Sequence, residues 1–169
     1  MTTTTDGVVE HEDGRSVIRF RRRLAHPVER VWAALTRPDE LRTWWGEADV
    51  DLVEGGRFTV RWLNTDPDGN RVEMPATITA LDPPRLLEVA GEPHGVLRWE
   101  LRGDDGGTVL EFTSTLELPD EYRTRTVAGW HYHLDALAEA LEGRSLDLVD
   151  LPNEHWDRIH EGYVASQDA

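Results

Sequence analysis

The sequence predicts an α+β fold: an antiparallel sheet of about six to seven strands, covered on one face by a long helix near the C-terminus. Two patterns predict it. Between residues 57 and 118, apolar and polar residues alternate between turn signals, which is typical of strands with one buried face. Residues 120–142 instead carry apolar side chains at helical spacing. We therefore expect this helix to lie across the sheet.

The chain is expected to begin with a hairpin at Asp13-Gly14, followed by the strand Arg15–Leu24. In that strand, Arg22 falls on the apolar face with Phe20 and Leu24. Because burying an unpaired charge is costly, Arg22 must find an acceptor. Two partners remain open for it, a structural carboxylate or a carboxylate or phenolate of a ligand, and a position at the rim of the sheet is the third possibility.

Two short helices are predicted after this strand. Pro27 is a favoured first helical residue, and the apolar positions after it have the spacing of a core stripe. Pro38 starts a second helical turn, and Trp44 and Trp45 follow it. We expect these two tryptophans to pack back on the core.

Five further strands are predicted, separated by turns rich in Gly, Pro and Asp. Their ranges are 57–64, 72–81, 86–90, 96–102 and 108–118. In the long helix, Trp130, Leu134 and Leu137 belong to the apolar stripe, while Tyr132 and Asp135 are expected to face solvent. Residues 153–167 repeat an apolar spacing that predicts a short outer helix.

The composition excludes several classes of function. The chain has no Cys and no Lys, so thiolate, Cys-zinc, Schiff-base and P-loop chemistry are excluded. A net charge of −15 disfavours nucleic acid and anionic membranes as partners. The first ten residues lack the features of a signal peptide, and no apolar run is long enough to span a membrane. These features suit a soluble cytoplasmic protein.

The element order and several short motifs resemble the START-like helix-grip superfamily, also called SRPBCC. Within it, the chain resembles the branch of homologues of the heat-shock-protein ATPase activator. The motifs are Ala25-x-Pro27-x-x-x-Val31-Trp32-x-x-Leu35-Thr36, Leu41-x-x-Trp44-Trp45, Gly55-Gly56-x-Phe58, Asp82-Pro83-Pro84-x-Leu86, and Gly129-Trp130 with Leu134. The resemblance covers roughly residues 15–142. It implies a START domain over 15–143, preceded by an extension or extra hairpin strand (1–14) and followed by a tail with an amphipathic helix (144–169).

The resemblance also implies a curved sheet that wraps the long helix and leaves a hydrophobic cavity between them. Non-catalytic binding of a hydrophobic or aromatic small molecule there, as a carrier, sensor or sequestering protein, is the first expectation. No cofactor is implied, and we expect a monomer or a weak homodimer. No catalytic constellation stands out, and His131 and His133, two residues apart on a helix, cannot chelate one metal.

Three alternatives remain open. A polyketide cyclase or dehydratase would use His133 as a general base and Arg22 as an oxyanion partner. An antibiotic-resistance protein would bind a reactive enediyne and quench it at a glycine, such as Gly91, Gly95 or Gly129. A co-chaperone would use the acidic surface to bind a protein.

The candidate cavity residues share a predicted position between the sheet and the long helix. They are Arg22, Phe58, Trp62, Met74, Trp99, Phe112, Ser114, Gly129, Trp130, His133 and Leu137.

Overall fold

A computed structural model describes residues 6–92 and 94–167. The first five residues of the predicted N-terminal extension and the last two of the predicted tail lie outside these ranges. Within them, eight strands form one antiparallel sheet. The strands are β1 (Val8–Glu12), β2 (Arg15–Leu24), β3 (Gly46–Val50), β4 (Arg57–Thr65), β5 (Arg71–Asp82), β6 (Leu86–Gly91), β7 (Gly95–Asp104) and β8 (Gly107–Leu116).

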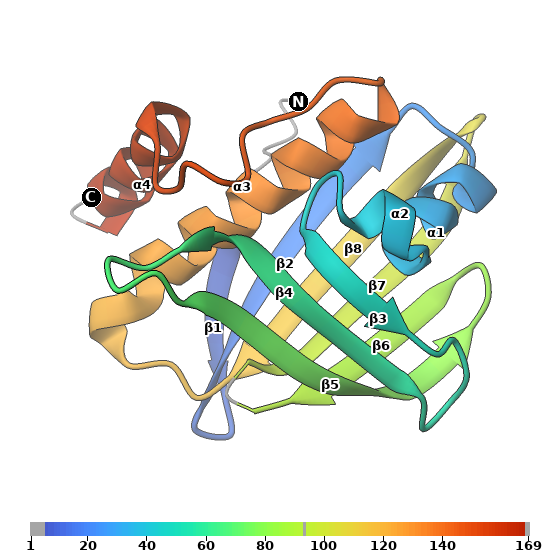
Figure 1. The fold of residues 1–169 in the computed structure, drawn as a ribbon, viewed down its shortest axis with the longest axis horizontal. Coiled ribbons are helices and arrows are strands. Elements are labelled where there is room, and N and C mark those ends of the chain that lie inside the picture. The colour runs from blue at the N-terminus through green and yellow to red at the C-terminus, as the bar shows by residue number, and fades with distance from the viewer. Residues whose placement is uncertain (1–5, 93, 168–169) are drawn as a thin grey trace.

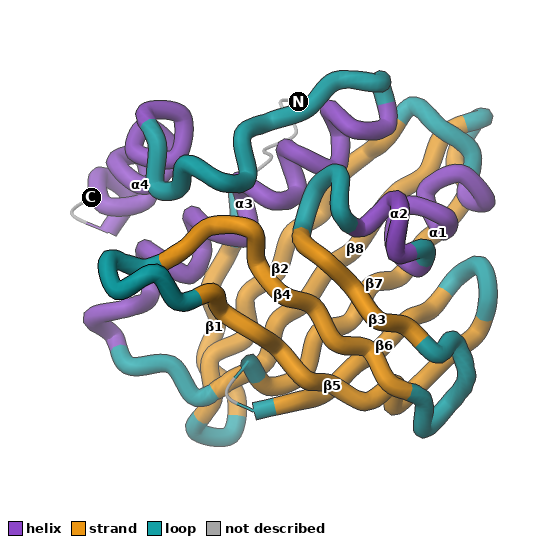
Figure 2. Tube along the Cα trace, viewed as in Figure 1, coloured by secondary structure: helices purple, strands orange, loops and turns teal. Residues whose placement is uncertain are grey.

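The sheet order is β1-β2-β8-β7-β6-β5-β4-β3, so β1 and β3 are its edges. The helices are α1 (Val28–Thr36), α2 (Pro38–Leu41), α3 (Arg123–Leu141) and α4 (Glu154–Gln167), and a single 3₁₀ turn (Asp120–Tyr122) precedes α3. The sheet curves around α3, and α4 lies on the side of α3 away from the strands (Figure 1). Figure 2 shows α1 and α2 together near one end of the sheet.

The predicted α+β fold is confirmed, with one strand more than expected. The additional strand is β3, whose sequence Gly46–Val50 (GEADV) has no alternation of apolar and polar residues. Gly46 allows β3 to approach β4 closely, because a Cβ there would lie 2.3 Å from the carbonyl oxygen of Arg61. A polar edge strand placed by backbone proximity has no periodic signal that would reveal it.

The core lies between the concave face of the sheet and α3. Leu134 and Leu137 of α3 are buried against it, as predicted. Trp44 and Trp45, in the turn after α2, have 0% exposure. The indole N–H of Trp44 donates to the carbonyl oxygen of Ala34 at 2.8 Å, which ties this turn to α1. The α1–α2 pair thus carries Trp45 into the space between sheet and helix.

The prediction that Tyr132 faces solvent is wrong, because the C-terminal segment covers that side of α3. Tyr132 is 1% exposed. Its hydroxyl donates to the carbonyl oxygen of Asp147 at 2.7 Å and accepts a hydrogen bond from Asn153 Nδ2 at 2.9 Å. Asp135 also lies under this cover, with 27% side-chain exposure. Tyr132 therefore anchors the C-terminal segment, and Asp135 Oδ2 lies 3.7 Å from His155 Nε2 of α4.

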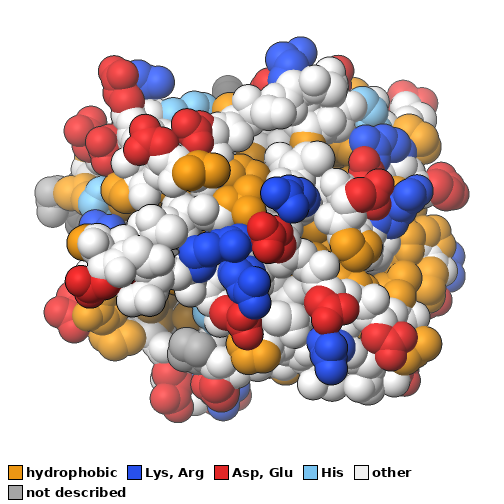
Figure 3. Space-filling view, in the orientation of Figure 1, with side chains coloured by type: hydrophobic (Ala, Val, Ile, Leu, Met, Phe, Trp, Pro, Cys, Tyr) orange, Lys and Arg blue, Asp and Glu red, His pale blue; other side chains and the backbone are white. Residues whose placement is uncertain are grey.

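The surface is strongly charged. Figure 3 shows acidic and basic side chains interspersed over one face, with small hydrophobic areas between them. Among residues 6–92 and 94–167, none of the helices has the length and hydrophobicity that crossing a membrane requires.

Candidate functional site

An open hollow of 610 Å³ lies beside the N-terminal half of α3, where β4, β5, β7 and β8 have their nearest ends. Apolar and aromatic side chains make up most of its wall. The lining residues are Trp62, Val72, His94, Leu116, Glu117, Leu118, Tyr122, Arg125, Thr126, Gly129, Trp130 and His133. We call it the main hollow.

A second hollow of 170 Å³ lies on the α4 side of the same helix. Both hollows are bordered by Trp62, Arg125, Gly129 and His133. The smaller one is completed by the C-terminal segment, through Leu151, Pro152 and Trp156 among others. The segment after α3 therefore helps to shape the site.

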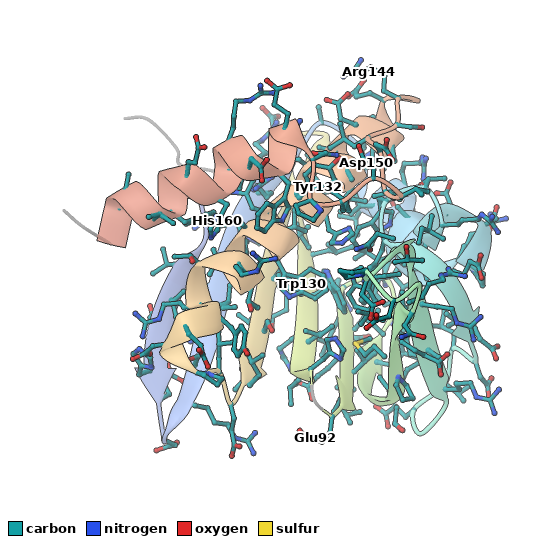
Figure 4. All side chains as sticks on the ribbon, turned by 60° about the vertical axis from the view of Figure 1, so that its left-hand side comes forward. Glu92, Trp130, Tyr132, Arg144, Asp150 and His160 are labelled. Atoms are coloured by element: carbon teal, nitrogen blue, oxygen red, sulfur yellow. The ribbon has the colours of Figure 1, made fainter. Side chains whose placement is uncertain are left out.

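Two tryptophans from different elements form the aromatic wall of the main hollow. The ring centroids of Trp62 and Trp130 are 6.5 Å apart, and both rings pack against Trp45, at 5.6 and 5.3 Å. Trp130 lies on the side of α3 that faces the strands, whereas Tyr132 lies near α4 and the segment carrying Asp150 (Figure 4). Trp45 forms a rigid floor behind both rings.

A bulge in β4 places Trp62 at this wall. The register between β4 and β5 shifts between Arg61 and Thr65, which interrupts the ladder of backbone hydrogen bonds. The side chain of Arg71 compensates, because its Nε donates to the carbonyl oxygen of Trp62 at 2.6 Å. Bulges commonly redirect a side chain toward a site, and this one holds Trp62 at the mouth of the hollow.

His133 borders both hollows with both ring nitrogens occupied. Its Nδ1 lies 2.9 Å from the carbonyl oxygen of Trp44 and must donate to it. Its Nε2 is then the acceptor for the indole N–H of Trp62, at 3.1 Å. Burial lowers the pKa of His133 to about 4. The ring is neutral near pH 7, and it fixes the orientation of Trp62.

His94 is the second imidazole of the main hollow. Its ring stacks on Trp62, with centroids 5.3 Å apart and an interplanar angle of 17°. Burial lowers its pKa. Its Nδ1 is buried and has no hydrogen-bond partner among the residues that the structure describes. His94 therefore contributes its ring to the wall and keeps one polar atom, without a described partner, behind it.

Gly129 keeps the space between the two hollows open. A Cβ at this position would meet no heavy atom within 4 Å, so close packing does not require a glycine here. A glycine inside a helix costs about 1 kcal/mol relative to alanine. Gly91 and Gly95 differ, because a Cβ there would lie 2.2 Å and 2.0 Å from backbone oxygens.

The predicted cavity residues divide into two groups. Trp62, Gly129, Trp130 and His133 border the main hollow. The other members from the sheet and α3 lie in the closed core, each with at most 1% exposure: Phe58, Met74, Trp99, Phe112, Ser114 and Leu137. The sequence analysis did not name Val72, His94, Tyr122 or Arg125 as site residues. Val72 continues the apolar alternation of β5, whereas His94 lies in a turn and Arg125 on an exposed helix position, where no periodic pattern marks a site.

Arg22 lies apart from both hollows. Its guanidinium forms an ion pair with Asp135 of α3 at 2.9 Å, and its side chain is only 8% exposed. Of the two partners that the sequence left open, the structural carboxylate is the one observed. Arg22 borders neither hollow lined by His133, so the two residues do not share one reaction site.

A polar cluster surrounds the Arg22–Asp135 pair and attaches α4. The hydroxyl of Tyr163 lies 2.7 Å from His131 Nδ1 and accepts the backbone N–H of Gly7 at 2.7 Å. Burial raises the pKa of Tyr163 to about 12 and lowers the pKa of His131, although the nearby Asp135 opposes the latter shift. The cluster therefore joins the N-terminal segment, α3 and α4 through neutral hydrogen-bonding groups and one ion pair.

Comparison with protein families gives one match over most of the chain. The family described as "Activator of Hsp90 ATPase homolog 1-like protein" matches residues 25–142. A search of curated protein sequences finds no match.

Solved structures with the same fold include CalU16 from Micromonospora echinospora, with 24% identity, a TM-score of 0.72, and coverage of 97% of this chain and 96% of that one. EF2215 from Enterococcus faecalis, a conserved protein of unknown function, has 21% identity, a TM-score of 0.72 and coverage of 96% and 90%. DynU16, a protein in the dynemicin biosynthetic locus, has 22% identity and a TM-score of 0.64. That match covers 76% of this chain and 48% of DynU16. At these identities, the likeness establishes the fold alone.

Proposed function

The chain belongs to the family of Activator of Hsp90 ATPase homolog 1-like proteins, and we propose that it binds an aromatic small molecule in the main hollow without transforming it. The protein would act as a carrier, sensor or sequestering protein. One observation carries the proposal: two tryptophans and a helical glycine border an open space of 610 Å³ on a rigid aromatic floor. Such a volume and wall suit a ligand of a few fused rings.

The exposed rim supports entry of an apolar molecule. Val72 and Tyr122 stand at the hollow with 48% and 52% of their surface exposed. Leu116 and Leu118 continue the apolar wall. Covering these side chains with a ligand would contribute about 25 cal/mol for each Å² of apolar surface removed from water.

The state of His133 favours binding over catalysis. A general base needs an available lone pair, and the Nε2 lone pair of His133 already accepts the N–H of Trp62. Its other nitrogen donates to the backbone. The cyclase alternative also needs Arg22 near the same substrate atoms, whereas Arg22 pairs with Asp135 elsewhere.

The test is quenching of tryptophan fluorescence by a panel of flavonoids, anthraquinones and fatty acids. Saturable quenching by a polycyclic aromatic compound is the expected result. Gly129→Leu is expected to weaken binding at least about tenfold, because the new side chain occupies the space between the hollows while its Cβ has room. Product analysis of the same mixtures is expected to return the ligand unchanged.

Gly162→Leu is the matched control. Gly162 is also helical, and a Cβ there also meets nothing within 4 Å, but it borders neither hollow. This variant should bind as the unmodified protein does. Absence of saturable binding across the panel, or equal weakening by both leucine variants, would refute the proposed site. Conversion of the ligand into a product would show that the protein is an enzyme and would contradict binding without transformation.

A second candidate is protection against a reactive enediyne. Two observations favour it: a protein in the dynemicin biosynthetic locus shares the fold, and Gly129 lines both hollows with an open Cα. A Cα hydrogen atom transferred to a carbon radical of the ligand would quench that radical. The Cα radical left behind would then add O₂ and lead to chain cleavage.

Mass spectrometry after incubation with reductively activated dynemicin tests this candidate. Cleavage at Gly129 is the expected result, and Gly129→Ala should reduce it, since the tertiary Cα of alanine is more hindered. An intact chain, or cleavage scattered over many glycines, would reject the candidate while leaving simple binding untouched.

A further inference from the structure

Arg125 stands where the two hollows meet. It lies in the first turn of α3 and borders both of them. Its guanidinium carbon lies 5.3 Å from the ring centroid of Trp156 on α4. This cation–π contact holds an exposed arginine at a defined place on the rim.

The charge of Arg125 is not neutralised by an ion pair. Most arginines of this acidic chain lie within 4.0 Å of a carboxylate oxygen, whereas Arg125 does not within the described part of the chain. Glu117 borders the main hollow too but forms no ion pair with Arg125 among these residues. A cation beside an aromatic hollow attracts an anion there, against the overall repulsion of a net charge of −15.

A second polar group lies on the wall of the same hollow. His94 stacks on Trp62, and its Nδ1 is buried without a partner among the described residues. An unsatisfied buried polar atom is costly. Because this nitrogen has almost no accessible surface, the imidazole ring must turn toward the hollow before a ligand oxygen can hydrogen-bond to it. Arg125 is therefore the polar group that an aromatic ligand on Trp62 and Trp130 meets directly.

We propose that the ligand of the main hollow is an aromatic acid, and that Arg125 binds its carboxylate or phenolate group. This inference rests on the proposed function and specifies its ligand class. The planar fork of a guanidinium matches a carboxylate with two parallel hydrogen bonds, and such charge-assisted bonds are about twice as strong as neutral ones. Arg125 is then a specificity-determining residue, with the ligand-binding role that the sequence analysis considered for Arg22.

The test compares two probes of the same ring system and nearly the same shape, one anionic and one neutral: anthraquinone-2-carboxylate and anthraquinone-2-carboxamide. Titration calorimetry with the full chain at pH 7.5 is expected to give a dissociation constant about tenfold lower for the carboxylate. Arg125→Gln should remove this preference by weakening the carboxylate alone. Arg125→Lys, which keeps the charge without the planar fork, should restore only part of it.

Arg102→Gln is the control, because Arg102 is another exposed arginine without an ion pair in the described chain, and it borders neither hollow. It should keep the full preference for the carboxylate. Equal affinity for both probes, or a preference that survives Arg125→Gln, would overturn the role of Arg125 while leaving aromatic binding intact. Absence of binding by either probe would contradict the hollow as an aromatic site as well.

Discussion

The two sides of α3 are built from different interactions. The side facing the sheet packs rings and aliphatic chains, with Trp130 against Trp45 at 5.3 Å and against Phe112 at 4.7 Å. The side facing α4 uses hydrogen bonds and charged contacts, among them the Arg22–Asp135 ion pair, around His131 and Asp135. Packing of apolar groups is not directional, so it can end at a hollow without leaving a polar group unpaired. Hydrogen bonds and ion pairs on the other side require each partner in its position.

This difference explains where a ligand can enter. Ring packing ends at Trp62 and Gly129 and leaves apolar surface that a similar ring can cover. On the other side, hydrogen bonds such as Tyr132 to Asp147 fasten the C-terminal segment over the helix. The hollow on the α4 side is the smaller one, 170 Å³ against 610 Å³ on the sheet side. We therefore expect a ligand of several rings to bind on the sheet side, and substitutions in the polar cluster to affect the attachment of the tail.

The largest effect is expected on the sheet side, from Trp45→Ala. Trp45 has 0% exposure and contacts five aromatic rings, so its loss should lower the free energy of unfolding by about 5 kcal/mol. Urea denaturation measures it. Trp32→Ala, on α1 and only partly buried, should cost clearly less. Equal costs for the two variants would mean that the ring cluster is not the centre of the core.

On the α4 side, Asp135→Asn should cost about 3–4 kcal/mol of unfolding free energy, because it removes the carboxylate that forms an ion pair with the buried Arg22. The same denaturation measurement applies. Glu111→Gln serves as control: it removes the partner of the exposed Arg21, and exposed pairs contribute about 1 kcal/mol or less. If both variants cost the same, the Arg22–Asp135 pair is no anchor.

On the sheet side, acid should act through His133. Its pKa is lowered from 6.5 to about 4 in the folded state, so the unfolded chain binds a proton more readily between these values. Stability is therefore complete above pH 6.5 and falls by about 3 kcal/mol as the pH drops toward 4. His133→Gln lacks this titration and should show a flatter pH profile in that window. Parallel profiles for the two proteins would contradict a buried, neutral His133.

A smaller effect is expected from Tyr163→Phe, which removes two hydrogen bonds of the polar cluster. Loss of the contacts to His131 and Gly7 should cost about 1–2 kcal/mol. Hydrogen–deuterium exchange should speed up in α4 and leave β7 and β8 unchanged. Tyr122→Phe, at a side chain with 52% exposure, should change neither the free energy of unfolding nor the exchange rate in α4. Faster exchange throughout the sheet would show that α4 is not a separately attached element.

Periodicity predicted the sheet side well and the α4 side poorly. The stripe containing Trp130, Leu134 and Leu137 is apolar, so a helical period identifies it. Tyr132 and Asp135 are polar, and polar residues opposite such a stripe are usually solvated. The sequence does not show that they are covered, because their partners are distant. Those of Tyr132 lie 15 and 21 residues later, and Arg22, the partner of Asp135, lies 113 residues earlier.

The site was predictable only in part, for a similar reason. The positions of Trp62, Gly129, Trp130 and His133 at the hollow could be predicted from the face of the strand or helix on which each residue lies. His94 and Arg125 do not, since one lies in a turn and the other on an exposed helix position. Arg22 stayed a candidate for ligand binding because its partner Asp135 is distant in sequence. Which charged residues pair depends on the tertiary structure, and the alternation of apolar and polar residues along a strand does not reveal it.

The most direct test of the main hollow uses the indole N–H resonances of the seven tryptophans. An ¹H–¹⁵N spectrum would be recorded during titration with anthraquinone-2-carboxylate, with assignment by Trp→Phe variants. We expect saturable shifts for Trp62 and Trp130, and none for Trp32 on α1, which borders neither hollow. Unchanged resonances of Trp62 and Trp130 at saturating probe, or shifts equally large at Trp32, would contradict the hollow as the binding site.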